Sequence, residues 1–510
     1  MVVARTRAVA LHGVEGSLVE IEADLANGLP AFTIIGLPDA ALGEAKDRVR
    51  SAAANSGLDL PNRKVTVNLS PASLPKHGSA FDVAIAVAAL ATTGLLALDA
   101  VAETVHIGEL SLDGRLRPVA GVLPAVLAAR RSGARLVVVP WGNRGEAELV
   151  PGIRVVGAAT LREVLALHGA ALDPPTDPVE PIAAPAPRES IETDGDLADV
   201  VGHPEAVEAL QVAAAGGHHL LMLGPPGAGK TLLASRLPGL LPDLDTDAAV
   251  EVSSVRSLAG LGLGDGLVRR PPLEAPHHSA TMASLVGGGS GLVRPGAISR
   301  AAHGVLFLDE APEFAGAVLD ALRQPLETGE ITIHRARTVA RFPARFQLVL
   351  AANPCPCGQA GTIDADCTCT PIMRRRYLAR LSGPLLDRID LHLTVRRVGA
   401  AQLTGQGAGA VTTAEARFRV TNARERTRER WGSEGWSTNA RVPGPVLRGA
   451  AWRLPSHDRA PLDRALERGA LTMRGYDRVL RVAWSLADLD GASRPEAEHV
   501  GRALYLRRGI

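Results

Sequence analysis

The chain has 510 residues, of which 46% are hydrophobic, and its formal net charge is +1. This length exceeds one ordinary hydrophobic core, so we expect two or three domains. With a net charge near zero, the protein as a whole has no electrostatic attraction to nucleic acid or to an anionic membrane surface. No apolar run approaches the roughly 18–20 residues of a membrane span, and the first residues lack a secretory signal. We expect a cytoplasmic protein without a membrane partner, whose cysteines are thiols or metal ligands.

Changes in composition divide the sequence into four parts. Residues 172–196 contain six prolines and several acidic residues, which indicates an extended acidic linker. We expect one domain before it, over 1–171, and a second after it, over 197–396. Residues 397–510 are expected to be helical, because apolar residues recur every three or four positions over 476–489. Prolines divide this last part into several short helices.

Two stretches of the N-terminal part, 75–82 and 108–121, resemble the Lon protease domain. Active members of that family use a Ser–Lys dyad, in which the lysine serves as the base for the serine. Aligned on the family's Pro-Lys-Asp-Gly-Pro-Ser-Ala-Gly motif, the nucleophile position of this chain falls on Ala80 and the lysine position near Leu123. Ser79 is one residue away and would lack its base. The resemblance implies a Lon-like α/β fold, of the ribosomal S5 domain 2 type, used for ring assembly or DNA guidance rather than proteolysis.

An apolar segment at 220–223 leads into a glycine-rich loop and then a helical stretch, which is the context that a phosphate-binding P-loop requires. The N–H groups of the loop and the N-terminus of the helix are expected to bind phosphate. Lys230 would reach the β- and γ-phosphates, and Thr231 would hold Mg²⁺. The predicted nucleotide-binding residues are Gly224, Pro225, Pro226, Gly227, Ala228, Gly229, Lys230, Thr231 and Leu232.

Two later apolar segments also end in polar residues. Residues 305–308 are followed by Asp309 and Glu310. At the carboxyl end of a buried strand, Asp309 would act on Mg²⁺ and Glu310 would orient and deprotonate the attacking water. Residues 346–352 end at Asn353, whose amide can hydrogen-bond the γ-phosphate or the water. Alternatively, Asp309 and Glu310 are surface acids at the end of a strand and have no catalytic role. The P-loop earlier in the sequence makes this alternative less favoured.

The four cysteines follow Asn353 closely, with the spacing C-x-C-x9-C-x-C. They are Cys355, Cys357, Cys367 and Cys369. Four thiolates match a closed tetrahedral Zn²⁺ site that would pin a loop. The one-residue gaps are shorter than the usual two to four, so free thiols remain an alternative, followed by an iron–sulfur centre or a disulfide. A basic run at 374–376 comes next.

Two arginines are candidates for contact with the transferring phosphoryl group. Arg388 lies in the stretch 381–391 and is a candidate arginine finger. Arg474, in the helical C-terminal part, would reach the phosphates from a lid. Most single arginines are solvated surface residues, and it is their position after the P-loop, the acid pair and the amide that favours a role. Residues 396–510 contain 21 Arg against 12 Asp and Glu, which suits either DNA binding or a solvated lid face.

This ordered set of motifs resembles the AAA+ ATPases, and within them the Mg-chelatase-like ComM/YifB family. The narrowest signatures are Asn353-Pro-Cys-Pro-Cys-Gly358 and the stretch 381–392, and the resemblance extends over nearly the whole chain. It implies an α/β/α P-loop core with a helical C-terminal lid, ATP and Mg²⁺ as cofactors, and a homo-hexamer with ATP between subunits. Arg388 would then act on the ATP of the neighbour. Well-described relatives migrate branched DNA during uptake and recombination of foreign DNA.

The resemblance also implies insertions that line the pore of the ring. Residues 269–299 would form one before the acid-pair strand, and residues 330–346 would form a β-hairpin. The tip of that hairpin carries His334, Arg335 and Arg337, which are candidate contacts to DNA phosphates. An ordinary exposed hairpin is the alternative.

Three functions remain open at this stage. The first is an ATP-fuelled hexameric motor, a helicase or branch-migration factor on single-stranded or branched DNA. The second is the ATPase subunit of a metal-insertion or protein-remodelling complex, which predicts a separate metal-binding partner and no stimulation by DNA; the Lon-like part argues against it. The third is an active ATP-dependent protease, which Ala80 and Leu123 disfavour.

Overall fold

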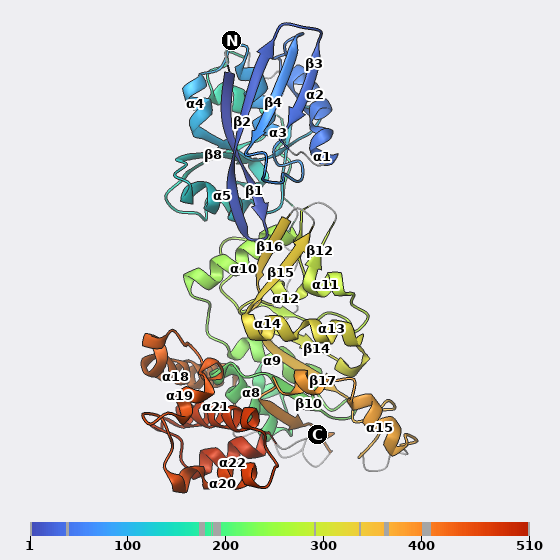
Figure 1. The fold of residues 1–510 in the computed structure, drawn as a ribbon, viewed down its shortest axis with the longest axis vertical. Coiled ribbons are helices and arrows are strands. Elements are labelled where there is room, and N and C mark those ends of the chain that lie inside the picture. The colour runs from blue at the N-terminus through green and yellow to red at the C-terminus, as the bar shows by residue number, and fades with distance from the viewer. Residues whose placement is uncertain are drawn as a thin grey trace.

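The computed structural model describes residues 3–36, 40–172, 179–184, 186, 195–289, 292–335, 338–361, 367–399 and 410–507. The molecule is elongated, with an N-terminal α/β part at one end, a second α/β part in the middle and a helical C-terminal part at the other end (Figure 1). The expected fold class, two α/β units followed by helices, is confirmed. In the described part of the chain, no helix combines the length and the apolar character needed to cross a membrane.

The N-terminal part is built on a seven-stranded sheet in the order β3-β4-β2-β1-β5-β8-β9. Its strands are β1 (Val3–His12), β2 (Glu15–Ala26), β3 (Ala31–Ile35), β4 (Lys64–Ser70), β5 (Thr104–His106), β8 (Leu136–Pro140) and β9 (Arg154–Ala158), and the short pair β6 (Glu109–Leu110) and β7 (Leu116–Arg117) lies outside it. Its helices are α1 (Ala40–Gly43), α2 (Ala45–Asn55), α3 (Asp82–Ala91), α4 (Leu98–Glu103), α5 (Val122–Arg131), α6 (Arg144–Ala147) and α7 (Leu161–Leu167). Every residue of α3 is buried, as expected of a helix that is apolar on all sides.

The residues of the Lon-like motif have structural partners in this part. Lys76 is fully buried, and its ammonium group donates to three backbone carbonyls, those of Gly36, Leu69 and Pro71. All three of its protons are therefore engaged. The hydroxyl of Ser79 donates to the carboxylate of Glu109. Leu123 is buried in the first turn of α5.

Two buried histidines connect β5 to the end of α7. The hydroxyl of Thr6 lies 2.8 Å from Nδ1 of His106, and Nε2 of His106 lies 2.9 Å from Nε2 of His168. Burial lowers the pKa of both histidines, so both are neutral in the folded protein near pH 7. A proton on the facing nitrogen of each ring would break their shared hydrogen bond.

This pair predicts that the N-terminal part loses stability in mild acid. The unfolded chain takes up protons as pH falls through about 6.5 whereas the folded pair does not, so the free energy of unfolding should fall by up to about 1.4 kcal/mol per pH unit for each histidine. Hydrogen exchange of β5 and α7 between pH 7 and pH 5, corrected for intrinsic rates, measures this. His168→Gln removes one titrating ring and should flatten the slope, and an unchanged slope would contradict the assignment.

The middle part contains a five-stranded parallel sheet in the order β11-β14-β17-β10-β18. Its strands are β10 (Leu220–Leu223), β11 (Leu273–Glu274), β14 (Val305–Leu308), β17 (Gln347–Ala352) and β18 (Leu391–Thr394). Its helices are α8 (Pro204–Gly216), α9 (Lys230–Leu240), α10 (Thr246–Ala259), α11 (Met282–Val286), α12 (Ala297–Arg300), α13 (Gly316–Ala321), α14 (Arg323–Thr328), α15 (Pro371–Leu378) and α16 (Gly383–Leu386). The central strands are apolar and buried, as in parallel sheets covered on both faces. Because β14, β17 and β10 are adjacent and parallel, the residues that follow them meet at one edge.

The expected β-hairpin is present and consists of β15 (Glu330–Arg335) and β16 (Thr338–Pro343). His334 is exposed near its tip, whereas Arg337 lies outside the described residues. The segment 269–299 contains β11, α11, α12 and a second short hairpin, β12 (Gly287–Gly288) with β13 (Arg294–Pro295).

The body of the β15–β16 hairpin packs against the N-terminal part (Figure 1). The N–H group of Val14, in the turn between β1 and β2, donates to the carbonyl of Arg341 at 3.3 Å. A side chain on Gly13 would overlap that carbonyl, so the two backbones meet directly. Phe342 and Leu258 are buried in the apolar cluster at this contact. The hairpin is therefore attached to the N-terminal part at Arg341 of β16, whereas the side chains of Glu330, His334 and Val339 are exposed.

The C-terminal part consists of helices around a tryptophan cluster. The helices are α18 (Thr413–Trp431), α19 (Gly444–Arg448), α20 (Ser456–Glu467), α21 (Met473–Asp490) and α22 (Ala497–Tyr505). Trp431 packs against Trp436, Trp452 and Trp484, mostly edge to face, and the guanidinium of Arg430 lies 4.3 Å from the ring centre of Trp484. These tryptophans belong to an apolar core that the C-terminal helices share with α8 and α9 of the middle part.

Candidate functional site

The predicted P-loop joins β10 to α9. Gly227 and Gly229 have φ values of +75° and +89°, which only glycine adopts readily. A side chain on Gly224 would overlap the carbonyl of Val395 after β18. The glycines thus allow the loop to curl tightly against the sheet before α9 begins at Lys230.

Lys230 connects this loop to the end of β17. The residue is 7% exposed, and its ammonium donates to the carbonyls of Gly224 at 2.6 Å and Pro225 at 3.0 Å and to Oδ1 of Asn353 at 3.1 Å. Desolvation lowers the pKa of Lys230, and the charges of the acid pair oppose that shift. The cation and the Asn353 amide therefore lie side by side, although they are more than a hundred residues apart in sequence.

The acid pair approaches the other side of the loop. The hydroxyl of Thr231 donates to Oδ2 of Asp309 at 2.7 Å. A hydroxyl and a carboxylate are hard oxygen ligands of the kind that Mg²⁺ prefers. Glu310 has a φ of +51°, an uncommon conformation for a residue other than glycine, of the kind that often marks functional sites. Its half-exposed carboxylate lies 3.4 Å from Nδ1 of His278.

Two neighbours of this site are not evident from the sequence motifs. His278 comes from the 269–299 insertion and reaches Glu310 across the sheet edge. The buried Tyr377 of α15 has its pKa raised to about 12, mainly by burial and then by the charges of Glu313 and Glu310, while a hydrogen bond with the backbone of Asn353 opposes the shift. Both contacts depend on segments that only the fold brings together.

The four cysteines form one cluster whose sulfur atoms all lie within 4.8 Å of one another. The separations from Cys355 are 3.4 Å to Cys357 and 3.7 Å to Cys367, and Cys357 lies 3.6 Å from Cys367. A tetrahedral zinc site with Zn–S bonds of about 2.3 Å has sulfur atoms ~3.8 Å apart. The four donors, Cys355, Cys357, Cys367 and Cys369, therefore fit Zn²⁺.

Hydrogen-bond donors around the cluster favour thiolates. The N–H group of Ala360 lies 3.4 Å from the sulfur of Cys355, and the guanidinium of Arg374 lies 3.3 Å from that of Cys367. The pKa of Cys357 is lowered to about 6, first by the N–H group of Gln359 and then by its cysteine neighbours, whereas these neighbours and burial raise the pKa of Cys369 to about 11, so in the absence of a cation the cluster favours a thiolate at Cys357 and a thiol at Cys369. Such outer contacts orient metal ligands in known sites.

Arg388 and Arg474 lie together in one cavity of about 280 Å³. Its walls are His219, Leu326, Glu327, Asp387, Arg388, Asp390, Ala440, Arg474, Arg478 and Arg481. Arg388 pairs with Glu327, and Arg474 lies 3.8 Å from Asp387. Burial, and then the neighbouring arginines, lower the pKa of Arg388. Within the described residues, the hydrogen bonds and ion pairs of these two arginines do not reach the P-loop.

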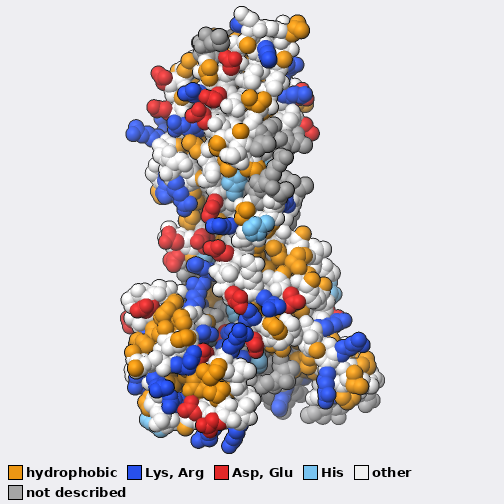
Figure 2. All heavy atoms as spheres, viewed as in Figure 1, with side chains coloured by type: hydrophobic (Ala, Val, Ile, Leu, Met, Phe, Trp, Pro, Cys, Tyr) orange, Lys and Arg blue, Asp and Glu red, His pale blue; other side chains and the backbone are white. Residues whose placement is uncertain are grey.

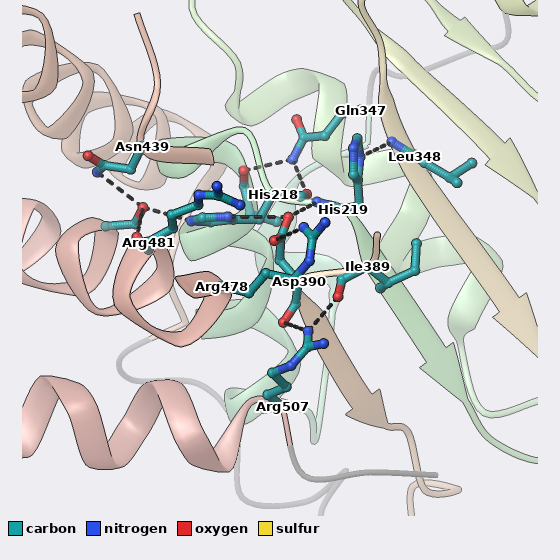
Figure 3. Close-up of polar contacts among 12 residues, drawn as sticks. His218, His219, Gln347, Leu348, Ile389, Asp390, Asn439, Arg478, Arg481 and Arg507 are labelled. Atoms are coloured by element: carbon teal, nitrogen blue, oxygen red, sulfur yellow. Dashed lines mark hydrogen bonds and ion pairs between the residues drawn. The ribbon is translucent and has the colours of Figure 1, made fainter. Parts of the chain in front are cut away.

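A buried network forms the back of this cavity (Figure 3). Asp390 is 1% exposed and accepts from the N–H of His219 at 3.1 Å and from Arg478 at 2.6 Å, while Nδ1 of His218 lies 3.5 Å away. Burial alone would raise the pKa of Asp390, but Arg478 and His218 outweigh it and hold that pKa well below its ordinary value. Because Arg478 is one helical turn after Arg474 on α21, this ion pair fixes the face that α21 presents to the cavity.

A P-loop, an acid pair and an amide at the carboxyl edge of a parallel sheet, followed by a helical part, define a AAA+ ATPase. Three family profiles describe the same arrangement. "Subunit ChlI of Mg-chelatase" matches residues 21–143, "Magnesium chelatase, subunit ChlI" matches 196–403, and "Magnesium chelatase, subunit ChlI C-terminal" matches 410–507.

Several known proteins are similar to this chain over nearly its full length. The competence protein ComM of Haemophilus influenzae is 44% identical over 98% of this chain and 96% of its own length. The YifB protein of Escherichia coli is 40% identical over 98% and 96%, and a protein of Mycobacterium tuberculosis is 50% identical over 100% and 99%. The chain belongs to the ComM/YifB family of magnesium-chelatase-like AAA+ ATPases. Its N-terminal region is also similar to Lon protease of Mycolicibacterium smegmatis, at 29% identity over 175 residues.

Membership of this family implies ATP and Mg²⁺ as cofactors. The chain's own residues fit both. Thr231 and Asp309 offer adjacent oxygen atoms for the metal ion, and the ammonium of Lys230 and the amide of Asn353 lie together beside the phosphate-binding loop. The resemblance inferred from the motifs is thereby confirmed at the level of the family.

Proposed function

We propose that this protein is an ATP-driven motor that acts on single-stranded or branched DNA as a hexameric ring. The observation that carries the proposal is the cavity shared by Arg388 and Arg474, which are bound to carboxylates rather than to the P-loop of their own chain. Two guanidinium groups that line one cavity of about 280 Å³ fit a phosphate from outside the chain. In a closed ring that phosphate belongs to the ATP of the adjacent subunit.

We also propose a role for each residue of the nucleotide site, which the contacts among these residues support. Lys230 binds the β- and γ-phosphates, and Thr231 and Asp309 hold Mg²⁺. Glu310 is the base that takes the proton of the attacking water, and Asn353 responds to the γ-phosphate through its amide. Arg388 and Arg474 stabilise the charge of the phosphoryl group on the neighbouring subunit.

We also propose a role for each of the four parts of the chain. Residues 1–171 form a Lon-like part without proteolysis, supported by the engagement of Lys76 with three carbonyls. Residues 172–196 form the linker, residues 197–396 the ATPase core, and residues 397–510 the lid. The β15–β16 hairpin offers the exposed His334, which lies next to its tip, as a contact to DNA. On the face seen in Figure 2, basic side chains of the C-terminal part are interspersed with acidic ones.

We also propose that the cysteine cluster binds one structural Zn²⁺. Sulfur separations near a tetrahedral edge, two hydrogen bonds to sulfur from outside the cluster and the lowered pKa of Cys357 support this. Such a metal would hold its loop in place rather than take part in hydrolysis, because four thiolates leave no open position for water.

If the protein is a DNA motor, forked and single-stranded DNA should raise the rate of ATP hydrolysis severalfold, because hydrolysis is coupled to movement along the bound DNA. The effect should fade as salt is raised from 50 to 200 mM, since phosphate contacts release counterions. Steady-state ATPase assays with a salt series, accompanied by light scattering to find the hexamer, measure both. Lys230→Ala is the inactive control.

A rate that is indifferent to DNA would contradict the motor. It would favour the ATPase subunit of a metal-insertion or remodelling complex, the alternative that the match to the magnesium chelatase ChlI profile supports. Copurification with a separate metal-binding subunit would then be the observation to seek. Cleavage of a casein substrate would instead point to the protease alternative.

A further inference from the structure

The loop that carries the first two cysteines packs directly on the P-loop. Gly358 has a φ of +77°, and a Cβ atom built on it would lie 2.6 Å from Cδ and 2.7 Å from Cγ of Pro226. The same Cβ would lie 4.0 Å from Cγ of Asn353. The N–H group of Gly358 closes the turn by donating to the carbonyl of Cys355 at 2.9 Å. No methyl group fits between this turn and the phosphate-binding loop.

The cysteine loop is also continuous with the amide that contacts Lys230. Asn353 follows β17, and Cys355 comes only two residues later. The position of Cys355 therefore limits where the Asn353 backbone can lie, and with it the amide oxygen that accepts from Lys230 at 3.1 Å. Two chain segments leave the cluster toward the nucleotide site, one through Gly358 and one through Asn353.

The opposite side of the cluster is fixed to α15. Arg374 donates to the sulfur of Cys367 and to the carbonyl of Cys369. Tyr377, one turn further along this helix, is buried beside the backbone of Asn353, and Arg380 pairs with Glu313 after the acid-pair strand at 2.9 Å. The helix itself is anchored, although its residues Ile372 and Met373 are exposed.

These contacts place the cysteine cluster between an anchored helix and the phosphate-binding loop. Four thiolates within 4.8 Å of one another, three of them at separations of 3.4–3.7 Å, repel one another unless a cation or protons neutralise them. A bound metal ion makes the compact arrangement favourable, and its binding free energy is available to order the loop. The metal ion would thereby press Gly358 against Pro226.

We propose that the metal-bound cysteine loop is a structural wall of the nucleotide site, and that occupancy of the metal sets the affinity for ATP. The inference rests on the zinc proposed above. With the metal in place, Pro226 and Asn353 are held in the positions that bind phosphate. Without it, the turn at Gly358 separates from Pro226 and the P-loop must be ordered by ATP itself. Ordering a loop on binding weakens affinity, because the conformational entropy is lost at that moment.

The first test compares loaded and metal-free full-length protein, without DNA. Mass spectrometry of the metal should find one zinc per chain, and a thiol-competing chelator should remove it. We expect the Kd for a fluorescent ATP analogue to rise at least tenfold on removal and to recover when Zn²⁺ is restored. The fluorescence of the tryptophan cluster should stay unchanged, which shows that the C-terminal fold is intact. Hydrogen exchange should increase in the peptides that contain Pro226 and Asn353.

The second test separates contact from metal content with a matched pair of glycines. Gly358→Ala introduces a methyl group against Pro226, whereas Gly361→Ala has a similar φ of +75° and no atom within 4 Å of its added carbon. Both variants carry the same cost of a left-handed alanine. We expect both to bind one zinc, but only Gly358→Ala to bind the ATP analogue at least tenfold more weakly.

The outcomes distinguish this inference from the proposals on which it rests. Zinc-bound and metal-free proteins with equal ATP affinity would overturn the inference and leave the metal site standing. Protein that never binds zinc would overturn the metal site and the inference together. Equal affinities of Gly358→Ala and Gly361→Ala would show that the contact with Pro226 has no effect. None of these results depends on whether the motor acts on DNA.

Discussion

Replacement of Glu310 by glutamine is expected to lower the kcat of ATP hydrolysis by about 10²–10⁴-fold while ATP still binds. Glutamine keeps the size of the side chain but cannot accept the proton of the attacking water. The residues that contact one another around the phosphate-binding loop, Lys230 with Asn353 and Thr231 with Asp309, are unchanged. The variant should therefore accumulate in an ATP-bound state.

Single-turnover hydrolysis and equilibrium binding of ATP separate the two effects. Glu313→Gln is the matched control, because Glu313 lies three residues later, pairs with Arg380 and has no proposed part in proton transfer. Its kcat should stay within a few fold of the unmodified protein. Normal turnover by Glu310→Gln would show that another group takes the proton, and His278, 3.4 Å from Glu310, would be the first to examine.

Replacement of Arg388 by alanine should reduce hydrolysis by about 10³-fold or more and leave ATP binding intact. The guanidinium belongs to a cavity separate from the P-loop of its own chain, so its loss removes charge from the transition state on the next subunit. Arg323→Ala is the control, since Arg323 is a neighbouring, half-exposed arginine paired with Asp320 at 3.9 Å.

A mixing experiment shows on which subunit Arg388 acts. Subunits with Arg388→Ala keep an intact P-loop, and subunits with Lys230→Ala keep an intact Arg388. Mixed rings should therefore recover hydrolysis that neither variant shows alone. Mixed rings that assemble but stay inactive would place the action of Arg388 on its own chain, which its contacts with Glu327 and the carbonyl of Pro384 do not favour.

The parallel sheet explains why much of the nucleotide site can be predicted from sequence. Asp309 and Asn353 follow the apolar strands β14 and β17, and Lys230 follows the loop after the apolar strand β10. These three strands are adjacent and parallel, so their carboxyl ends lie at one edge of the sheet. The helical C-terminal part was predictable from the periodicity of α21. In both cases local pattern and overall fold agree.

The remaining contacts depend on segments that meet only in three dimensions. Asp390 and Arg478 are 88 residues apart, and no local pattern marks their buried ion pair. Tyr377 and His278 reach the site from α15 and from an insertion, whose paths are set by packing rather than by periodicity. For the same reason the sequence could not show that the hairpin contacts the N-terminal part.

That contact between the hairpin and the N-terminal part has a consequence for the modularity of the chain. Phe342 is 1% exposed in an apolar cluster that contains Leu11 and Val14 of the N-terminal part as well as residues of the middle part. A cut in the linker would turn this apolar contact into free surface on both fragments, and such surfaces promote aggregation. We therefore expect the N-terminal and middle parts to be more soluble together than apart. A gene that combined segments of two relatives would keep this contact only if the turn at Gly13 and the strand of Arg341 came from the same parent. We therefore expect the N-terminal and middle parts to be inherited together.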